Sequence, residues 1–156
     1  MQVTIRPLEE KDAYTSVKWR NDHEVFKYTG NTYSSEITIE SELNWIRNVI
    51  ANNEAGKEFR CAIEVDGEYV GNIYLTHLTM GIGHYHIFIG NKDYWGKGIA
   101  KEASRLIISE GFNSLGLRGI EPNVRPENVT AYNLYKKLGF VEFGKTEEYI
   151  KMIINK

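Results

Sequence analysis

Apolar and polar side chains alternate between residues 59 and 65, which is the period of a strand with one buried face. Asp66 and Gly67 follow, a pair that favours a tight hairpin turn. The apolar pattern resumes over residues 69–78 and, after a loop that contains glycines, over residues 84–89. We therefore predict three consecutive strands, and the short turns between them require antiparallel pairing.

A period of three to four residues marks the helices. One helix follows Thr38, a suitable N-cap, and its apolar face consists of Ile39, Leu43, Ile46 and Ile50. Two more have these expected inner faces: Ala13, Tyr14 and Val17 within residues 9–19, and Ile99, Ala103, Leu106 and Ile107 within residues 98–112. The remaining elements are a helix over residues 129–138, ended by Gly139, and strands over residues 3–5, 119–124, 140–143 and 149–154.

The resulting order is β, α, α, β, β, β, α, β, α, β, β, which predicts an α+β fold. A doubly wound parallel sheet is disfavoured, because three strands follow one another without an intervening helix. The length of 156 residues suits one compact domain spanning residues 1–156.

Composition narrows the class of protein further. A net charge of −2 argues against a general nucleic-acid binder, which usually carries a basic excess. The N-terminus has no apolar core typical of a signal peptide, and no stretch approaches the roughly 20 apolar residues that cross a bilayer. The single cysteine, Cys61, excludes an internal disulfide and any multi-cysteine metal site, and its place in an alternating strand indicates a core position. We expect a cytoplasmic protein that binds neither nucleic acid nor membrane and holds no metal.

The sharpest chemical signal lies in residues 91–103, where two glycines, Gly96 and Gly98, join an apolar strand to an apolar-faced helix. Glycines allow the backbone to approach a ligand closely, and free N–H groups at the start of a helix bind anions. The segment is therefore a candidate pyrophosphate cradle, with a plain strand-to-helix turn as the alternative. The Walker spacing fails because five residues separate Gly90 from Gly96, and the dinucleotide fingerprint fails because Lys101 stands where its third glycine belongs.

Two blocks resemble one family. Residues 94–100 read Tyr-Trp-Gly-Lys-Gly-Ile-Ala, and residues 126–140 contain Asn128, Ala131, Tyr135 and the pair Gly139-Phe140. In order and on these elements, they resemble the GNAT superfamily of N-acetyltransferases, especially its ribosomal-protein and amino-sugar branch. Asp93 departs from the Gln or Arg usual at the first position of the loop. The resemblance covers residues 59–144 well, and Arg6-Pro7-Leu8 and Trp19-Arg20-Asn21-Asp22 fit the branch more loosely.

The resemblance implies a fold and a cosubstrate. The fold would be a central, mostly antiparallel and twisted sheet of six to seven strands with four helices, splayed between the fourth and fifth strands. The cosubstrate would be acetyl-CoA, whose acetyl group passes directly to an amine. The implied cofactor-binding residues are Ile87, Phe88, Ile89, Tyr94, Trp95, Gly96, Lys97, Gly98, Ile99, Ala100, Asn123, Asn128 and Tyr135. Tyr135 would also protonate the leaving thiolate, although the residues alone favour a core aromatic on the inner face of the helix.

The general base is the more open question. His84 and His86 lie two apart on a predicted strand and hence on one face, and their ordinary pKa near 6.5 suits proton transfer. A bulge would instead turn Tyr85 toward the site. Glu121 is the next candidate, Glu64 a weaker one, and a water chain needs no side chain.

The acceptor is open as well. In the family the first two helices and their connection cover it, which makes Arg20, Tyr28 and Tyr33 candidate substrate-binding residues. We expect a primary amine on a small molecule or peptide, with an amino sugar nucleotide or a protein N-terminus favoured. The alternatives are a polyamine such as spermidine, suggested by the acidic Glu36, Glu40 and Glu42, and a non-catalytic CoA-binding module. A homodimer is possible for this family.

Overall fold

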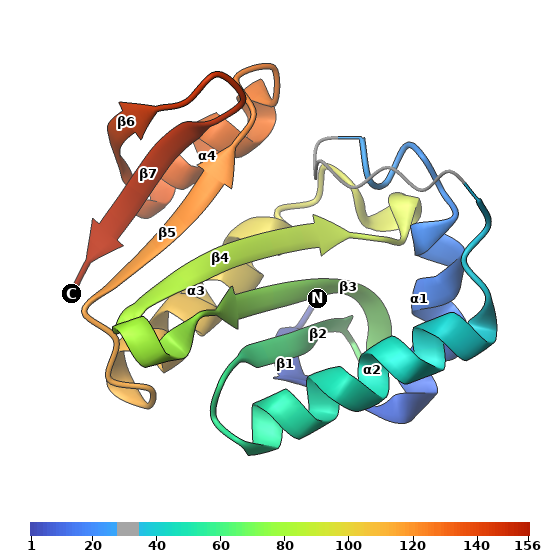
Figure 1. Cartoon of the computed structure of the whole chain (residues 1–156). Helices are drawn as coiled ribbons and strands as arrows, with labels where there is room; N and C mark the ends of the chain where they lie inside the picture. Colours follow the sequence, from blue (N-terminus) through green and yellow to red (C-terminus); the bar gives the residue numbers. More distant parts are fainter. Residues whose placement is uncertain (28–34) are drawn as a thin grey trace.

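The computed structural model describes residues 1–27 and 35–156, and it is built around one twisted seven-stranded sheet (Figure 1). The strand order is β1-β2-β3-β4-β5-β7-β6, and every pairing is antiparallel except that of β4 with β5. The strands are β1 (Val3–Pro7), β2 (Phe59–Val65), β3 (Glu68–Thr76), β4 (Ile82–Ile89), β5 (Gly119–Val124), β6 (Val141–Lys145) and β7 (Ile150–Asn155). The predicted α+β class and the mostly antiparallel sheet are confirmed.

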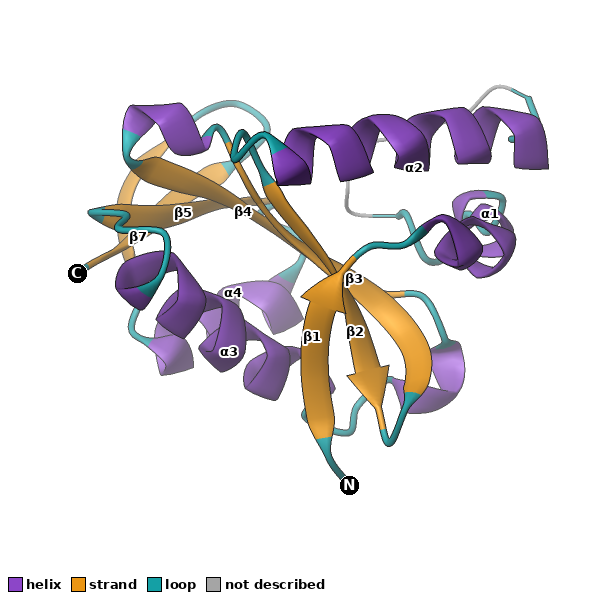
Figure 2. Cartoon of the chain, turned by 90° about the horizontal axis from the view of Figure 1, so that it is seen from below, coloured by secondary structure: helices purple, strands orange, loops and turns teal. Residues whose placement is uncertain are grey.

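Helices cover both faces of this sheet (Figure 2). Helices α1 (Ala13–Arg20) and α2 (Ile39–Glu54) lie on one face, which we call the α1–α2 face, and α3 (Ile99–Asn113) and α4 (Val129–Leu138) lie on the other. Three short 3₁₀ turns, η1 (Glu10–Asp12), η2 (Leu78–Met80) and η3 (Lys92–Tyr94), were not predicted. None of the helices in the described ranges has the length and apolar character needed to cross a bilayer.

The turn chemistry read from the sequence is confirmed. Asp66 and Gly67 both adopt positive φ, of 50° and 87°, as a tight turn between β2 and β3 requires. Thr38 caps α2 by accepting a hydrogen bond from the backbone N–H of Ser41. Gly139 ends α4 in the left-handed conformation with φ of 103°.

Two large apolar clusters, and a third formed by Trp19, Val25 and Phe26, hold the sheet between its helices. The larger lies against α3 and α4 and includes the fully buried Tyr85, Ile107, Ile120 and Met152. The smaller lies under α1 and α2 and includes Ile46, Val49 and Ala62. Cys61 belongs to the larger cluster, and burial raises the pKa of its thiol to about 12, which confirms a core role and leaves no reactive thiolate at neutral pH.

Two helix faces differ from the prediction. Tyr14 is 59% exposed. Helix α1 begins only at Ala13, after the 3₁₀ turn η1, and its inward face carries Ser16 and Trp19 in place of Tyr14. Leu106 is 38% exposed, because the buried stripe of α3 runs through Ala103, Ile107 and Gly111. Leu106 therefore lies on the flank of the helix.

Candidate active site

The glycine loop that precedes α3 has the geometry of an anion cradle. Gly96 and Gly98 have φ of 73° and 79°, a conformation that side chains with a Cβ rarely adopt, and a Cβ at either position would meet no atom within 4 Å. The backbone N–H groups of residues 96–101 donate no hydrogen bond within the described ranges. These free donors stand at the positive end of the α3 dipole, so an anion is the ligand they fit.

Aromatic residues fix the position of this loop. The Trp95 indole donates to the carbonyl oxygen of Ile89 at 2.7 Å, and the Tyr94 hydroxyl donates to Oε1 of Glu68 at 2.9 Å. The ammonium group of Lys97 lies 5.6 Å from the centre of the Tyr94 ring. Tyr94 and Trp95, predicted to bind the cofactor, thus use these side-chain groups within the protein, and their backbone N–H groups donate to the carbonyl oxygens of Asn91 and Lys92.

Strands β4 and β5 pair along the first part of their length and then diverge (Figure 1). Their parallel pairing runs from Ile82 opposite Gly119 to Tyr85 opposite Pro122 and then stops. Residues 86–89 of β4 keep their partners on β3 but have no strand partner on the β5 side. Pro122, which has no N–H, stands at the last paired position. The backbone of residues 86–89 therefore offers an open edge for an extended ligand.

Helix α4 brings two predicted residues to this opening. Asn128 caps the helix, with its Oδ1 accepting from the N–H of Ala131 at 3.2 Å, and its amide N–H groups have no partner among the described residues. The Tyr135 ring is buried edge-on against Tyr85, with centroids 5.4 Å apart. Its hydroxyl makes no hydrogen bond within the described ranges. Because Arg125 Nε is the only fully buried side-chain nitrogen or oxygen there that lacks a partner, the Tyr135 hydroxyl must reach solvent.

The two predicted histidines face the α1–α2 side. Tyr85 points into the opposite core and no bulge interrupts β4, so His84 and His86 share the other face with Phe88. Glu121 lies opposite His84 in the strand register, and its Oε1 is 3.5 Å from His84 Nε2. The structure thus brings together three of the residues proposed from sequence. Glu64 is not among them, since it lies on β2 and pairs with Arg6.

A third histidine joins this group. The His77 ring lies against His84 with centroids 4.5 Å apart, and its Nδ1 is 3.1 Å from the hydroxyl of Thr76. His77 has φ of 59°, in the left-handed region that is uncommon outside glycine. Sequence reasoning gave His77 no role, because the irregular loop between β3 and β4 hides the register that pairs Thr76 with His84.

Both histidines on β4 are held neutral. Desolvation, reinforced by His77, lowers the pKa of His84. His86 is open to solvent on one side yet crowded by protein on the other, and this desolvation together with the charge of Arg60 lowers its pKa to about 4. A neutral imidazole can accept a proton, so both are free to act as bases at neutral pH, and the pKa of about 4 makes His86 a weaker base than an ordinary histidine.

The segment at the end of α1 ties this helix to α2, to the residues just before α2 and to the turn η3. The Arg20 guanidinium pairs with the buried Glu42 on α2 at 2.7 Å, and its centre lies 3.9 Å from the Trp45 ring. Asn21 accepts from the N–H of Ile37 at 2.7 Å and donates to its carbonyl oxygen at 2.9 Å. Asp22 pairs with Lys92 at 2.8 Å. The substrate role expected for Arg20 stays a prediction, and Tyr28 and Tyr33 lie outside the described residues.

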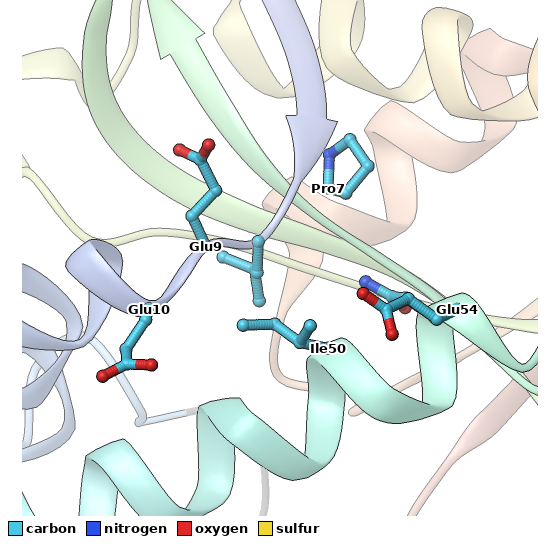
Figure 3. Close-up of a pocket in the computed structure, with 7 residues that line it drawn as sticks. Pro7, Glu9, Glu10, Ile50 and Glu54 are labelled. Atoms are coloured by element: carbon cyan, nitrogen blue, oxygen red, sulfur yellow. The ribbon is translucent and has the colours of Figure 1, made fainter.

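A shallow depression lies elsewhere, between the end of β1 and the second half of α2 (Figure 3). Pro7, Leu8 and Ile50 form its apolar part, and Glu9, Glu10 and Glu54 stand around it. Glu10 is paired with Arg47, and Glu9 with Lys11. None of the residues proposed from sequence as part of the site lines it.

Comparisons with known proteins place the chain in a family. A family model of the acetyltransferase (GNAT) domain matches residues 2–141. A curated relative, described as uncharacterized N-acetyltransferase p20 of Bacillus licheniformis, is 28% identical over 151 residues, which is 96% of this chain and 85% of that protein. The chain therefore belongs to the GNAT acetyltransferase family and is an acetyl-CoA-dependent N-acetyltransferase.

Solved structures share the fold. Spermidine N-acetyltransferase from Vibrio cholerae, in complex with CoA and spermine, gives a TM-score of 0.84 at 24% identity, covering 99% of this chain and 95% of that one. Ribosomal-protein-S5-alanine acetyltransferase from Vibrio fischeri gives 0.88 at 19% identity, covering 99% and 93%. The two differ in the acceptors that their names give, so the shared fold leaves the acceptor of this chain to be argued from its own residues.

Proposed function

We propose that this acetyltransferase acts on a primary amine of a small molecule, with an amino sugar nucleotide favoured and a protein N-terminus as the peptide alternative. The observation that carries the proposal is the open edge of β4, which leads from the free N–H groups before α3 to the unbonded hydroxyl of Tyr135. A pyrophosphate, an extended arm and a leaving group would meet these three features in that order.

The residues present fit acetyl-CoA. The N–H groups of residues 96–101 would hold its pyrophosphate, and the open backbone of residues 87–89 would pair with the amides of its arm. The free amide of Asn128, with Asn123 on β5, would donate to the same arm. When bound, acetyl-CoA supplies an activated acetyl group to an attacking amine.

The chain's own task on the acceptor side is to remove a proton. A lysine-like amine has a pKa near 10.4, so its neutral form costs about 4–5 kcal/mol at pH 7. His86 and His84 are neutral, share one face beside the splay, and would accept this proton at a ring nitrogen, directly or through water. Glu121 at 3.5 Å would stabilise the imidazolium that forms on His84.

On the cofactor side the task is to supply a proton. Burial raises the pKa of Tyr135, so its hydroxyl is fully protonated at neutral pH. The ring is held by Tyr85 and Phe140, and only its hydroxyl is left without a partner in the described structure. Tyr135 would therefore donate its proton to the departing sulfur.

Replacing Gly98 with valine tests the cradle. The side chain would disfavour the left-handed backbone and stand between the N–H groups and their ligand, so CoA affinity measured by calorimetry should fall at least about tenfold, roughly 1.4 kcal/mol. Gly116→Val is a matched control, because Gly116 also has positive φ, of 67°, and open space around its Cβ but lies far along the chain from the loop. Equal CoA affinity in a folded Gly98→Val protein would contradict the assignment.

Thiol release from acetyl-CoA over a panel of amines tests the reaction itself. Turnover of a primary amine is expected, with amino sugars and peptide N-termini among the substrates. Tight CoA binding without turnover of any amine would favour the non-catalytic module.

A further inference from the structure

The β5–β7 side of the splay carries two cations that the protein leaves uncompensated. On β5, Glu121 and Asn123 alternate with the buried Ile120, Pro122 and Val124, and the same alternation places Arg125 on the α1–α2 face just beyond the strand. Lys151, on β7, lies opposite Asn123 in the register of the β5–β7 pair and therefore points to the same face. Its charge is close enough to His84 to act on it electrostatically.

Several other charges around this face are paired within the protein. Lys92 meets Asp22 and Glu24, and the remaining ion pairs are Arg20 with Glu42 and Arg60 with Glu58, whereas Glu121 contacts the neutral His84. Arg125 and Lys151 form no ion pair with any described residue, and Glu147 and Glu148 in the nearby β6–β7 turn are not within ion-pair distance of either.

Arg125 is also held in place without being satisfied. Its guanidinium lies over the Tyr149 ring, 5.3 Å from the centroid, while Lys151 lies over Phe143 at 5.5 Å. Arg125 Nε is buried and has no acceptor, alone in this respect among the side-chain groups of residues 1–27 and 35–156. A buried charged donor without an acceptor is costly, and native proteins seldom keep one that no ligand or water satisfies.

We infer that Arg125, supported by Lys151, binds an anionic group of the acceptor, so that the preferred substrate is a small primary amine that also carries a phosphate or a carboxylate. The planar guanidinium suits two parallel hydrogen bonds to such a group. This inference rests on the proposed function, since it names the class of amine at the same site. A polyamine, which carries only positive charge, would be repelled by both side chains.

Matched amine pairs test the inference. Glucosamine 6-phosphate against glucosamine probes the phosphate, 4-aminobutyrate against 4-aminobutanamide probes the carboxylate, and spermidine is the polycationic reference. Thiol release should show a kcat/KM about 10- to 100-fold higher for the anionic member of at least one pair, the range expected for hydrogen bonds to a charged group. The pair that responds identifies the source of the anion.

Variants assign the preference to a residue. Arg125→Gln should reduce the difference within the pair to about twofold or less, and Arg125→Lys should restore part of it, since it keeps the charge but loses the planar fork. Lys137→Gln is the control. This substitution also removes one positive charge, but from an exposed position on α4, on the other side of the sheet. Thermal melts establish that each variant is folded.

A second readout separates this inference from the reaction. Binding of each amine to the CoA-saturated protein, measured by calorimetry, needs no turnover, so an Arg125-dependent preference for the anionic amine would support the inference even if no amine were acetylated. Three results would overturn it: a preference for spermidine over every anionic amine, an equal response to Lys137→Gln, or a loss of CoA affinity in Arg125→Gln with the preference among amines unchanged. The last would assign Arg125 to the cofactor.

Discussion

Tyr85 and Tyr135 form an edge-to-face pair in the core and differ in what their hydroxyls do. Tyr85 shares a hydrogen bond with Ser104 on α3, whereas Tyr135 has no partner in the described structure. The first hydroxyl serves the fold, and the second is available for chemistry. The aromatic rings alone would not distinguish them.

Tyr135→Phe removes this available hydroxyl and keeps the ring packing. We expect kcat to fall by about 10²–10⁴, the usual contribution of an acid–base group, with CoA affinity nearly unchanged. Tyr85→Phe is the matched control and should leave kcat within a few-fold, with a modest loss of stability from the broken hydrogen bond. Steady-state kinetics measure kcat, and calorimetry measures CoA affinity. If a folded Tyr135→Phe protein turned over at the wild-type rate while the chemical step limits the rate, Tyr135 would have no part in the mechanism.

The pH profile distinguishes a base with a low pKa from an ordinary histidine. Only neutral imidazole accepts a proton, and with a pKa of about 4 His86 is already neutral above pH 5. Between pH 6 and 9 the kcat/KM of the parent protein should therefore rise only because a larger fraction of the amine is deprotonated. His86→Gln should lower it by about 10²-fold or more at every pH without changing the shape of the profile.

His84→Gln is the comparison within the same face, measured on the same amine. Since the pKa of His84 is also lowered, any inflection it contributes should fall below pH 6.5. Parental rates in both variants would make the histidines structural and leave Glu121 or a water chain as the base. An inflection near pH 6.5 that disappears in His86→Gln would contradict the lowered pKa of His86.

At the scale of elements, α1 and α2 are joined through a buried charge. Glu42 is 1% exposed, and its carboxylate accepts hydrogen bonds from Ser16 and Arg20 on α1. Glu42 lies in the first turn of α2, at the positive end of the helix dipole. Its burial could not be read from the local pattern, because the partners that neutralise it lie 22 and 26 residues away.

Glu42→Gln should therefore destabilise the fold strongly. Removing one member of a buried pair leaves the other charge uncompensated, and the expected loss is about 3 kcal/mol in the free energy of unfolding. Glu10→Gln, which breaks the exposed pair with Arg47, is the control and should have little effect. Urea denaturation measures both, and equal midpoints for the two variants would show that the Arg20–Glu42 pair does not hold the helices together.

The strands and long helices were predictable because their apolar periods are regular. The 3₁₀ turns were not, since three residues carry no period. On the inner face of α1, Ala13 was predicted correctly, but Tyr14 was placed there wrongly because Ser16, a polar residue, points inward instead. Gly96, Gly98 and Gly139 were found from sequence because their backbone conformations demand glycine. Arg125 was missed because nothing local shows that a strand-end cation will lack a partner.

For the whole molecule, the splay between β4 and β5 came from the family resemblance and not from the residue pattern. Periodicity predicts each strand but not where two parallel strands cease to pair. Pro122 is consistent with the last paired position, yet a proline alone would not have located it. The site depends on this topology, because the glycine loop, Tyr135 and the histidines come from β4, α3 and α4 and meet only at the splay.

The double hydrogen bond between Asn21 and Ile37 has a consequence for how the protein can change. It fixes both ends of the stretch between them, and the entropy of closing such a loop grows by only about 0.6 kcal/mol for each doubling of its length. Asn21 and Ile37 thus fix where the chain leaves α1 and where it enters α2, while Asp22, Val25 and Phe26 just after Asn21 are held by Lys92 and by the apolar cluster around Trp19. The family resemblance implies that this stretch covers the acceptor, so we expect changes of amine specificity made there to leave the sheet and the cofactor loop unaltered.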